Sequence, residues 1–322
     1  MAMQREVTYS VEHFYPKHPG HPMAALTAQA RGYFGDESIQ DSHLVIAGDN
    51  EGTIELLVQG KTEFSMDAHP AMLIEANARG KDLYIIGSYR NGLPFSVAAP
   101  PGTVKDAADL KGRRFVTNRR MGAGERTMRF IFEKLGMDPD RDMEVVLIDN
   151  EGMREKVAAI KEGQGDFLFY HQGGPQGRIV KELIRQGELV EVVDLSKLVP
   201  EYVVRSMAAS GRMVREHPEI VKGFIKGVMR AHRFIKHEDP MGADCIEILK
   251  QALNVDTLEG SGVENGIPKS WPVEPREVIA SVAGVQVHVD ELKAKGKIGP
   301  KFSAADVVRN ELGEEALAEL KN

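Results

Sequence analysis

The chain has 322 residues, of which 42% are hydrophobic and 28% are charged, a composition typical of a globular protein with room for two domains. Its 48 acidic and 41 basic residues give a formal net charge of -7 without a long basic run, which argues against a nucleic-acid partner and favours a small-molecule ligand. Cys245 is the single cysteine, so an internal disulfide and a cysteine cluster for zinc are excluded.

The N-terminal stretch contains no signal-peptide core. Arg5 and Glu6 interrupt any apolar run before a strand-like alternation begins at Val7, and no segment of the sequence is apolar for long enough to span a membrane. We therefore expect a periplasmic or cell-surface location if a leader has been removed, and a cytoplasmic one if Met1 is the native start.

The first hundred residues alternate between short β-branched runs and helical stretches. The patterns predict strands over residues 7–11, 43–47, 64–67 and 83–89, and helices over 22–32, 51–59 and 71–79. Such an alternation predicts a parallel sheet with helices on both faces. The cluster Pro100, Pro101 and Gly102 then interrupts the pattern and indicates a crossover to a second lobe.

A second series of the same kind follows, so the same unit is built twice. Strands are predicted over 111–117, 144–148, 167–170 and 189–194, and helices over 124–135, 152–161 and 178–186. Long helices are predicted over 213–236 and 241–252, before a Gly/Pro-rich passage around Trp271 and a final helical stretch. We expect this tail, including Trp271, to pack onto the first lobe.

The tetrapeptide DNEG occurs at residues 49–52 and again at 149–152. Each copy precedes a helix, a glycine (Gly60, Gly163), an acidic residue with a phenylalanine (Phe64, Phe167), and a histidine. Helix capping, a left-handed glycine and a core phenylalanine explain most of this pattern structurally.

The polar members of the two repeats are candidate ligand contacts. Asn50 with Glu51 follows one predicted strand, and Asn150 with Glu151 follows another; His69 and His171 follow two more. Ligands of open parallel sheets bind at the carboxyl ends of the strands, where helix N-termini also point. The alternative for both glutamates is a carboxylate that stabilises the first helical turn.

The order of motifs resembles the type II periplasmic binding proteins, especially the nitrate, sulfonate and taurine receptors of ABC transporters and the related pyrimidine-precursor synthases of thiamine biosynthesis. The resemblance covers roughly residues 5–250. It rests on Gly32-Tyr33-Phe34, on Ala108-Asp109-Leu110-Lys111-Gly112-Arg113-Arg114-Phe115, on Gly122-Ala123-Gly124 and on Leu135-Gly136-Met137-Asp138-Pro139.

This resemblance implies an α/β fold of two lobes, each a mainly parallel sheet flanked by helices, with a ligand cleft between the lobes. It places residues 1–99 and 207–322 in lobe 1 and residues 100–206 in lobe 2, with hinge segments near 98–102 and 200–210. It also implies a small-molecule ligand and an ABC permease as partners, with no cofactor.

Carried over by position, the resemblance gives a set of ligand-binding candidates: His18, His21, Asn50, Glu51, His69, Asn118, Arg119, Arg120, Gly122, Gly124, Glu125, Glu151, Tyr170, His171 and Gln172. The sequence departs from the family at three of them, because Glu51, Glu151 and Glu125 stand where small or hydroxyl residues are usual. Three carboxylates disfavour a plain inorganic or sulfonate anion unless nearby arginines outweigh them.

The leading hypothesis is a solute-binding protein whose ligand carries an acid group met by Arg119 or Arg120. The alternative is a cytoplasmic enzyme of the same fold, a metal-independent lyase, decarboxylase or hydrolase of a small, perhaps aromatic, acid. Its catalytic candidates are His69, His171, Glu51 and Glu151. The histidines show neither HxxxH nor HExxH spacing at these positions, so no metal is expected.

Overall fold

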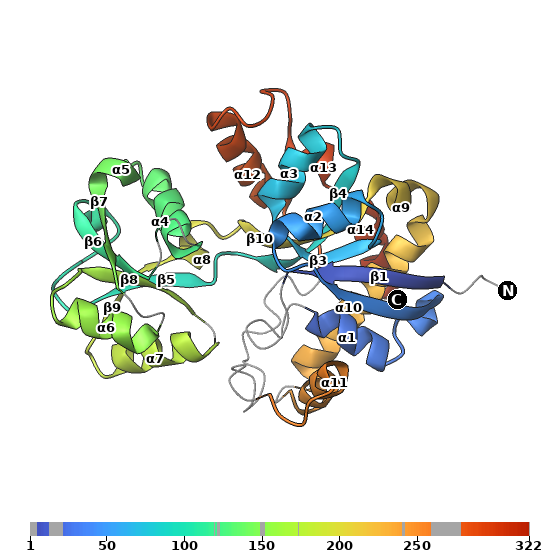
Figure 1. The fold of residues 1–322 in the computed structure, drawn as a ribbon, viewed down its shortest axis with the longest axis horizontal. Coiled ribbons are helices and arrows are strands. Elements are labelled where there is room, and N and C mark those ends of the chain that lie inside the picture. The colour runs from blue at the N-terminus through green and yellow to red at the C-terminus, as the bar shows by residue number, and fades with distance from the viewer. Residues whose placement is uncertain are drawn as a thin grey trace. The chain divides into compact units, whose positions relative to one another are not determined.

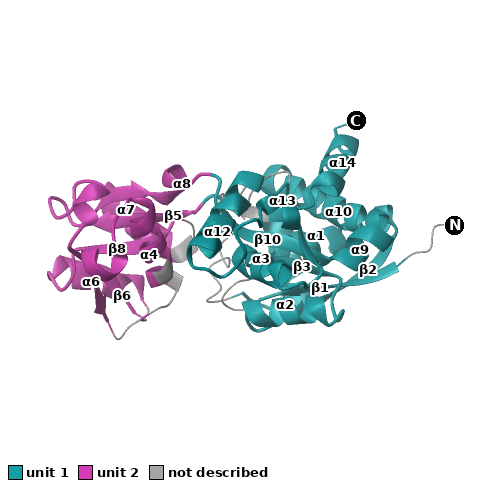
Figure 2. Ribbon diagram, turned by 90° about the horizontal axis from the view of Figure 1, so that it is seen from above, with its two compact units in different colours: residues 1–92, 201–322 teal, residues 93–200 magenta. Residues whose placement is uncertain are grey.

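The computed structural model describes residues 5–12, 22–118, 120, 123–148, 152–172, 174–239, 242–258 and 278–321, apart from the side chains at 89–91, 123, 126, 174 and 175. The chain divides into two compact units (Figure 2). Unit 1 combines residues 1–92 with 201–322, and unit 2 is the continuous segment 93–200. The chain therefore passes between the units twice.

Unit 1 is built on a five-stranded sheet in the order β2-β1-β3-β10-β4. Its strands are β1 (Arg5–Val11), β2 (Ile39–Ile46), β3 (Phe64–Ala68), β4 (Leu83–Asn91) and β10 (Val203–Ser210). β1 pairs in parallel with β2 and β3, whereas β10 pairs antiparallel with β3 and β4. The carboxyl ends of β1, β2 and β3 therefore meet at one edge, together with the start of β10.

Helices cover both faces of this sheet (Figure 1). One core holds the buried side chains of β1, α1 (Met23–Ala30) and α10 (Pro218–His237), with Phe224 stacked on Phe34 and Phe64. The other core lies between the sheet, α3 (Pro70–Ala78) and α12 (Val282–Ala294). The remaining helical elements of unit 1 are the 3-10 turn Gly35–Glu37, α2 (Asn50–Val58), α9 (Gly211–Glu216), α11 (Ala243–Leu253), α13 (Ala304–Val307) and α14 (Glu311–Glu319).

Unit 2 repeats this architecture with the strand order β7-β6-β8-β5-β9. Its strands are β5 (Phe95–Ala99), β6 (Arg113–Thr117), β7 (Met143–Leu147), β8 (Phe167–His171) and β9 (Val190–Asp194). β6 pairs in parallel with β7 and β8, and β5 pairs antiparallel with β8 and β9. In both sheets, one antiparallel strand occupies the same fourth position.

The helices of unit 2 also lie on both faces of its sheet (Figure 1). On one side, the ring of Phe132 in α4 (Ala123–Lys134) stacks on Phe167 of β8. On the other, α6 (Met153–Lys161) and α7 (Gly174–Arg185) contribute Val157, Ile160 and Val180 to a separate core. The remaining helical elements are the 3-10 turn Ala108–Leu110, α5 (Pro139–Asp142) and α8 (Leu195–Leu198).

Two features differ from the sequence-based expectation. The segments β5 and β10 were not predicted as strands, and their pairing places the unit boundaries at 92/93 and 200/201, a few residues before the predicted lobe limits. The single helix predicted over 213–236 is two helices, because Pro218 cannot donate a backbone hydrogen bond and begins α10 afresh after His217. The prediction for Trp271 lies outside the described residues.

None of the helices that the structure describes is both long and apolar enough to cross a membrane.

Candidate functional site

The carboxyl edge of the first sheet is organised around Arg205, in the first half of β10. Its Nη1 donates to Asn50 Oδ1 at 2.7 Å, and its Nη2 lies 2.8 Å from Glu12 Oε2. The backbone N–H of Glu12 in turn donates to both carboxylate oxygens of Asp67, at 2.9 and 3.0 Å. We call Glu12, Asn50, Asp67 and Arg205 the Arg205 cluster.

These contacts follow from the strand order. β10 runs antiparallel to β3, so its first residues lie beside the last residues of β3; Ser206 donates through Oγ to Ala68 O at 3.0 Å. The side chain of Arg205 is 19% exposed and that of Glu12 is 12% exposed. A guanidinium paired with a carboxylate at this depth keeps both charges satisfied away from bulk water.

The first DNEG copy closes the turn between β2 and α2. Asp49 accepts a hydrogen bond from Gly52 N at 2.7 Å and is the N-cap of α2, as the capping rules predict. A Cβ on Gly52 would lie 2.5 Å from Ala47 O, so only glycine fits there. Asn50 is half-buried against Arg205, whereas Glu51 is exposed in the first helical turn.

The second copy follows β7 in the equivalent place, but its helix starts in a different register. Residues 149–151, including Asn150 and Glu151, lie outside the described residues, and Gly152 is the N-cap of α6. In α2 the corresponding Gly52 is already in the third helical position. The two copies thus mark the same strand-to-helix connection without being superimposable caps.

His69 follows β3 and is the N-cap residue of α3, before Pro70. Its ring lies 5.8 Å from the ring of His288 in α12, nearly perpendicular to it. His288 also packs against the ring of Tyr202 at 4.3 Å, and its Nε2 lies 2.8 Å from Val203 O. A histidine of the sheet edge is therefore linked through α12 to the segment where the chain re-enters unit 1.

Unit 2 has a hollow of about 270 Å³ at the corresponding carboxyl edge of its own sheet. Strand residues and the first turn of α4 line this second-sheet hollow, with Lys156 of α6 and Gln176 of α7. Its full lining is Phe95, Phe115, Val116, Thr117, Asn118, Gly124, Lys156, Phe169, Tyr170, His171 and Gln176. Four predicted ligand-binding residues are among them: Asn118, Gly124, Tyr170 and His171.

Aromatic rings form one wall of the second-sheet hollow. Phe95 and Phe169 stack with their ring centroids 4.6 Å apart, and His171 meets Phe95 edge-on at 5.0 Å. Register explains the grouping, because β5 and β8 are antiparallel with Phe95 opposite His171 and Val97 opposite Phe169. Alternation puts all of these side chains on one face of the sheet.

Gly124 opens the hollow toward α4. A Cβ at this position would lie 3.7 Å from Thr117 Oγ1 and 3.8 Å from the ring of Phe169, which is ordinary van der Waals contact. A methyl group therefore fits at Gly124, whereas a larger side chain would extend into the hollow.

A profile of one protein family matches residues 20–243 of the chain, more than half of its length; its description is NMT1/THI5 like. The chain belongs to the NMT1/THI5-like family. A sequence search among curated proteins finds no match for this NMT1/THI5-like chain.

Solved structures similar to this NMT1/THI5-like protein include two sulfonate-binding proteins and one nitrate-binding protein. The putative periplasmic sulfonate-binding protein of Methylobacillus flagellatus is 15% identical with a TM-score of 0.67, covering 100% of this chain and 96% of that one. The periplasmic aliphatic sulphonate binding protein of Escherichia coli is 14% identical with a TM-score of 0.62, covering 96% and 93%.

The third is the periplasmic nitrate-binding protein of Synechocystis, 14% identical with a TM-score of 0.58, covering 99% of this chain and 89% of the other. At these identities the similarity concerns the fold. It confirms the two-lobed α/β fold and the resemblance to periplasmic binding proteins expected from the sequence.

Other predicted site residues of this NMT1/THI5-like protein have structural partners. Glu125 is buried in α4, where Arg129 Nε donates to its Oε1 at 3.0 Å and Arg120 Nη1 lies 3.8 Å away. Gln172 donates through Nε2 to Ser96 Oγ and to Asp194 Oδ1, both at 2.8 Å.

Tyr170 lines the second-sheet hollow, but its hydroxyl donates to Glu191 Oε2 at 2.8 Å. Burial, with this carboxylate beside it, raises the pKa of the Tyr170 hydroxyl above its usual range. The predicted candidates His18, His21, Arg119, Gly122 and Glu151 lie outside the described residues.

Several residues at the two sheet edges were not predicted as site residues. Arg205 lies 155 positions from its partner Asn50, and this contact depends on the antiparallel placement of β10. Phe95 belongs to a strand that was not predicted, so its position beside Phe169 was not predicted either. The alternation of large side chains at Phe167, Phe169 and His171 was the one available signal for the aromatic wall.

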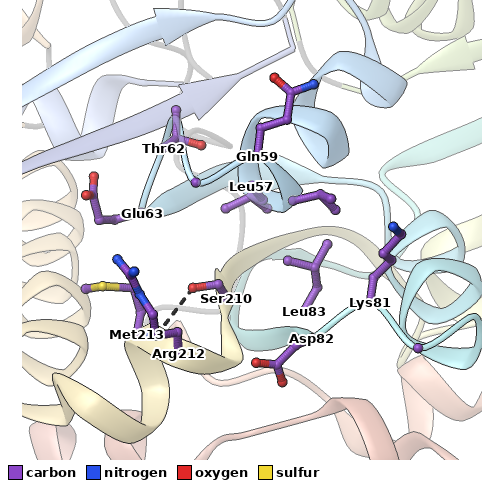
Figure 3. A pocket seen from close by; sticks show the side chains of 13 residues that line it. Leu57, Gln59, Thr62, Glu63, Lys81, Asp82, Leu83, Ser210, Arg212 and Met213 are labelled. Atoms are coloured by element: carbon purple, nitrogen blue, oxygen red, sulfur yellow. Dashed lines mark hydrogen bonds between the residues drawn. The ribbon is translucent and has the colours of Figure 1, made fainter.

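A larger hollow of about 480 Å³ lies at the opposite, amino edge of the first sheet (Figure 3). The end of α2 and the starts of β3 and β4 surround it, with Glu63, Lys81 and Arg212 among the labelled side chains. It contains none of the predicted site residues, and ligands of such sheets bind at the carboxyl ends of the strands instead.

The described residues of this NMT1/THI5-like chain contain neither a candidate metal site nor an exposed thiol. Within the described ranges, no group of three or more histidine, cysteine, aspartate or glutamate side chains is placed to hold a metal ion. Cys245 is buried in α11, and burial raises the pKa of its thiol to about 12, which keeps it protonated at neutral pH.

Proposed function

We propose that the protein is a solute-binding protein that binds a small organic acid for uptake through an ABC-type permease. The observation that carries the proposal is the second-sheet hollow. It lies at the carboxyl ends of the parallel strands β6 and β8, and both apolar and polar side chains line it. Its volume of about 270 Å³ suits a molecule of roughly the size of a small organic acid.

The polar side of the hollow supports an acid as the ligand. Thr117 and Asn118 offer hydrogen-bonding groups at the end of β6, and Lys156 adds a cationic side chain. The first turn of α4, at Gly124, also faces it, and the partial positive charge of a helix N-terminus favours an anion. Glu125 does not oppose this field strongly, because Arg129 neutralises its carboxylate.

The apolar side supports an organic ligand over an inorganic anion. Phe95 and Phe169 give the hollow a hydrophobic wall that a nitrate or sulfate ion would leave uncovered. Covering apolar surface stabilises a complex by about 25 cal/mol per Å², so an organic group gains affinity there.

The remaining sequence candidates are proposed as further ligand contacts. On unit 1 these are Asn50, Glu51 and His69, which lie at the carboxyl edge of the first sheet, and on unit 2 they include Arg120. The candidates outside the described residues complete the set: His18, His21, Arg119, Gly122 and Glu151. The Arg205 cluster supports this assignment, because it fixes the side chain of Asn50.

The comparisons also support a receptor over an enzyme. The similar structures described above are periplasmic proteins that bind sulfonate or nitrate, and they cover nearly the whole chain. We therefore propose a periplasmic location and an ABC permease as the partner, and the alternative of a cytoplasmic lyase, decarboxylase or hydrolase is not favoured.

A thermal-shift panel of small carboxylates, sulfonates and inorganic anions tests the proposal. We expect organic acids to raise the melting temperature, since a ligand that binds only the folded state stabilises it. Each acid that binds is then incubated with the protein and examined by mass spectrometry. Recovery of the unchanged acid supports a receptor, whereas a protein-dependent product would establish the enzyme instead.

A further inference from the structure

The aromatic wall of the second-sheet hollow has a definite shape. The planes of Phe95 and Phe169 are inclined by 25°, so the two rings are nearly parallel, whereas the plane of His171 is inclined by 86° to that of Phe95. All three residues line the hollow, and all three are half-buried. The two phenylalanine rings and the perpendicular ring of His171 thus form one corner of the hollow.

The rest of unit 2 holds these rings in place. β5 lies between β8 and β9 in the sheet, so Phe95 begins a central strand and does not sit on a free loop. A Cβ on Gly177, in α7, would lie 2.5 Å from His171 O and 2.6 Å from Gln172 O, so α7 packs directly on the end of β8. Because the backbone of β8 is fixed on both sides, the rings of Phe169 and His171 form a preorganised surface.

A planar ring suits such a corner better than a flexible or puckered group. Aromatic pairs prefer offset-stacked or edge-to-face contacts at centroid separations of roughly 4.5–7 Å. A ligand ring in the hollow could stack on one phenylalanine and meet the perpendicular ring edge-on at the same time. A saturated ring of similar size gains the apolar contact but neither of these directional contacts.

We propose that the ligand is an aryl acid, that is, a small carboxylate or sulfonate attached directly to an aromatic ring. The ring packs against Phe95, Phe169 and His171, and the acid group is directed toward Thr117, Asn118 and Lys156. This inference rests on the proposed function and narrows its ligand class.

The test compares matched aromatic and saturated acids by isothermal titration calorimetry. Benzoate is paired with cyclohexanecarboxylate, and benzenesulfonate with cyclohexanesulfonate, so that each pair shares its acid group and approximate size. In the pair whose acid group suits the site, we expect the aromatic acid to bind about tenfold more tightly than its saturated partner. The two pairs separate a carboxylate from a sulfonate ligand.

Variants of the wall residues test whether Phe95 and Phe169 cause the preference for aromatic over saturated acids. Phe95→Leu and Phe169→Leu keep an apolar side chain but remove the ring, and each should reduce the aromatic preference to less than about threefold. Phe132→Leu is the matched control, since Phe132 is buried and stacks on Phe167 without lining the hollow. Its preference should equal that of the wild type, and melting temperatures confirm that each variant is folded.

The outcomes separate this inference from the proposed function. Saturated acids that bind as tightly as aromatic ones, or an aromatic preference that survives both wall variants, overturn the aryl acid and leave the solute-binding proposal standing. If no acid of either kind binds the wild-type protein, both proposals fail.

Discussion

Arg205 joins three segments of unit 1 that lie far apart in the sequence. Its guanidinium contacts Glu12 after β1 and Asn50 in α2, and its own backbone belongs to β10. We expect Arg205→Gln to lower the free energy of unfolding by about 2 kcal/mol, because Glu12 loses the cation that neutralises it at low exposure. Urea unfolding measures this difference.

A double-mutant cycle shows whether the stability lost in Arg205→Gln comes from the ion pair between Arg205 and Glu12. In the Arg205→Gln background, Glu12→Gln should cost less than in the wild type, by about 1 kcal/mol. Arg212→Gln is the control, because Arg212 is exposed and forms no ion pair with a described residue; its effect should stay within about 0.5 kcal/mol. Additive effects of the two Arg205-cluster changes would show that the ion pair does not stabilise unit 1.

Single residues also show how far sequence reasoning reaches. The cap at Asp49 and the left-handed glycines Gly60 and Gly163 follow from local chemistry, and the structure confirms them. Glu125 illustrates the limit, since its position at the start of a helix suggested a ligand contact while its partner Arg129 lies one turn further along α4. A ligand contact and an ion pair with Arg129 are both compatible with this position in the sequence, and only the direction of the Glu125 side chain distinguishes them.

Among the helices, α12 packs closely on the segment that returns to unit 1. A Cβ on Gly284, in its first turn, would collide with the carbonyl oxygen of Glu201, and His288 one turn further on contacts Val203 O. Alanine favours a helix interior by about 1 kcal/mol over glycine, but overpacking against a backbone costs about 1–3 kcal/mol. Gly284→Ala should therefore destabilise the protein on balance.

The same substitution at Gly299 provides the comparison, because a Cβ there meets no atom within 4 Å. Gly299→Ala should change the midpoint of urea unfolding very little. Equal stability of the Gly284→Ala and wild-type proteins would mean that α12 is not closely packed on residue 201.

The contact between α14 and α10 should depend on pH. Glu319 accepts hydrogen bonds from Lys222 at 2.7 Å and Lys226 at 2.8 Å, and these hydrogen bonds lower the pKa of its carboxyl from 4.5 to about 2. A lowered folded-state pKa gives stability that is present above pH 4.5 and is lost as the pH falls toward 2. The side chain of Glu319 is 42% exposed, so solvent screening limits the effect to less than about 1 kcal/mol.

Glu319→Gln removes this titration. Between pH 5 and pH 2 the wild type should lose more stability than the variant, and the two should converge at the acidic end. Glu315→Gln is the control, since Glu315 lies 3.8 Å from Lys222 and its carboxyl makes the weaker contact. Parallel pH profiles for wild type and Glu319→Gln, measured by thermal unfolding, would contradict the assignment.

The elements show why the sheets were predicted only in part. The strands other than β5 and β10 were expected, because short β-branched runs alternate with helical stretches along the sequence. β5 and β10 both contain serine and alanine, and both pair antiparallel with strands distant in the sequence. Their assignment depends on tertiary pairing, which local periodicity does not contain.

At the scale of the whole molecule, unit 2 is one continuous segment with its own sheet and core. It begins next to β5 and ends after β9, and these strands are neighbours, so its ends lie on adjacent strands. We expect residues 93–200 expressed alone to fold and to unfold cooperatively, as single domains of this size usually do. Circular dichroism during heating checks this, and a chain without a cooperative transition would show that unit 2 needs unit 1.

The fold of the whole chain was predictable because two similar series of strands and helices precede a helical tail, and the family's motifs occur in the expected order. The hollow was predictable only in part. His171 follows from the rule that ligands bind at strand ends, whereas Asn118, Gly124 and Tyr170 were expected from the resemblance to periplasmic binding proteins. The aromatic wall arises from the pairing of β5 with β8, and its two phenylalanines were not among the candidates.

The central claim is that a small organic acid binds in the second-sheet hollow, and Gly124 offers the most direct test. Gly124→Ala adds a methyl group at ordinary contact distance, whereas Gly124→Leu extends a branched side chain past Thr117 and Phe169 into the space that the ligand would occupy. Calorimetric titration with an acid that binds the wild type should give near wild-type affinity for Gly124→Ala and no measurable binding for Gly124→Leu, with both variants folded. Undiminished binding by Gly124→Leu would contradict the account.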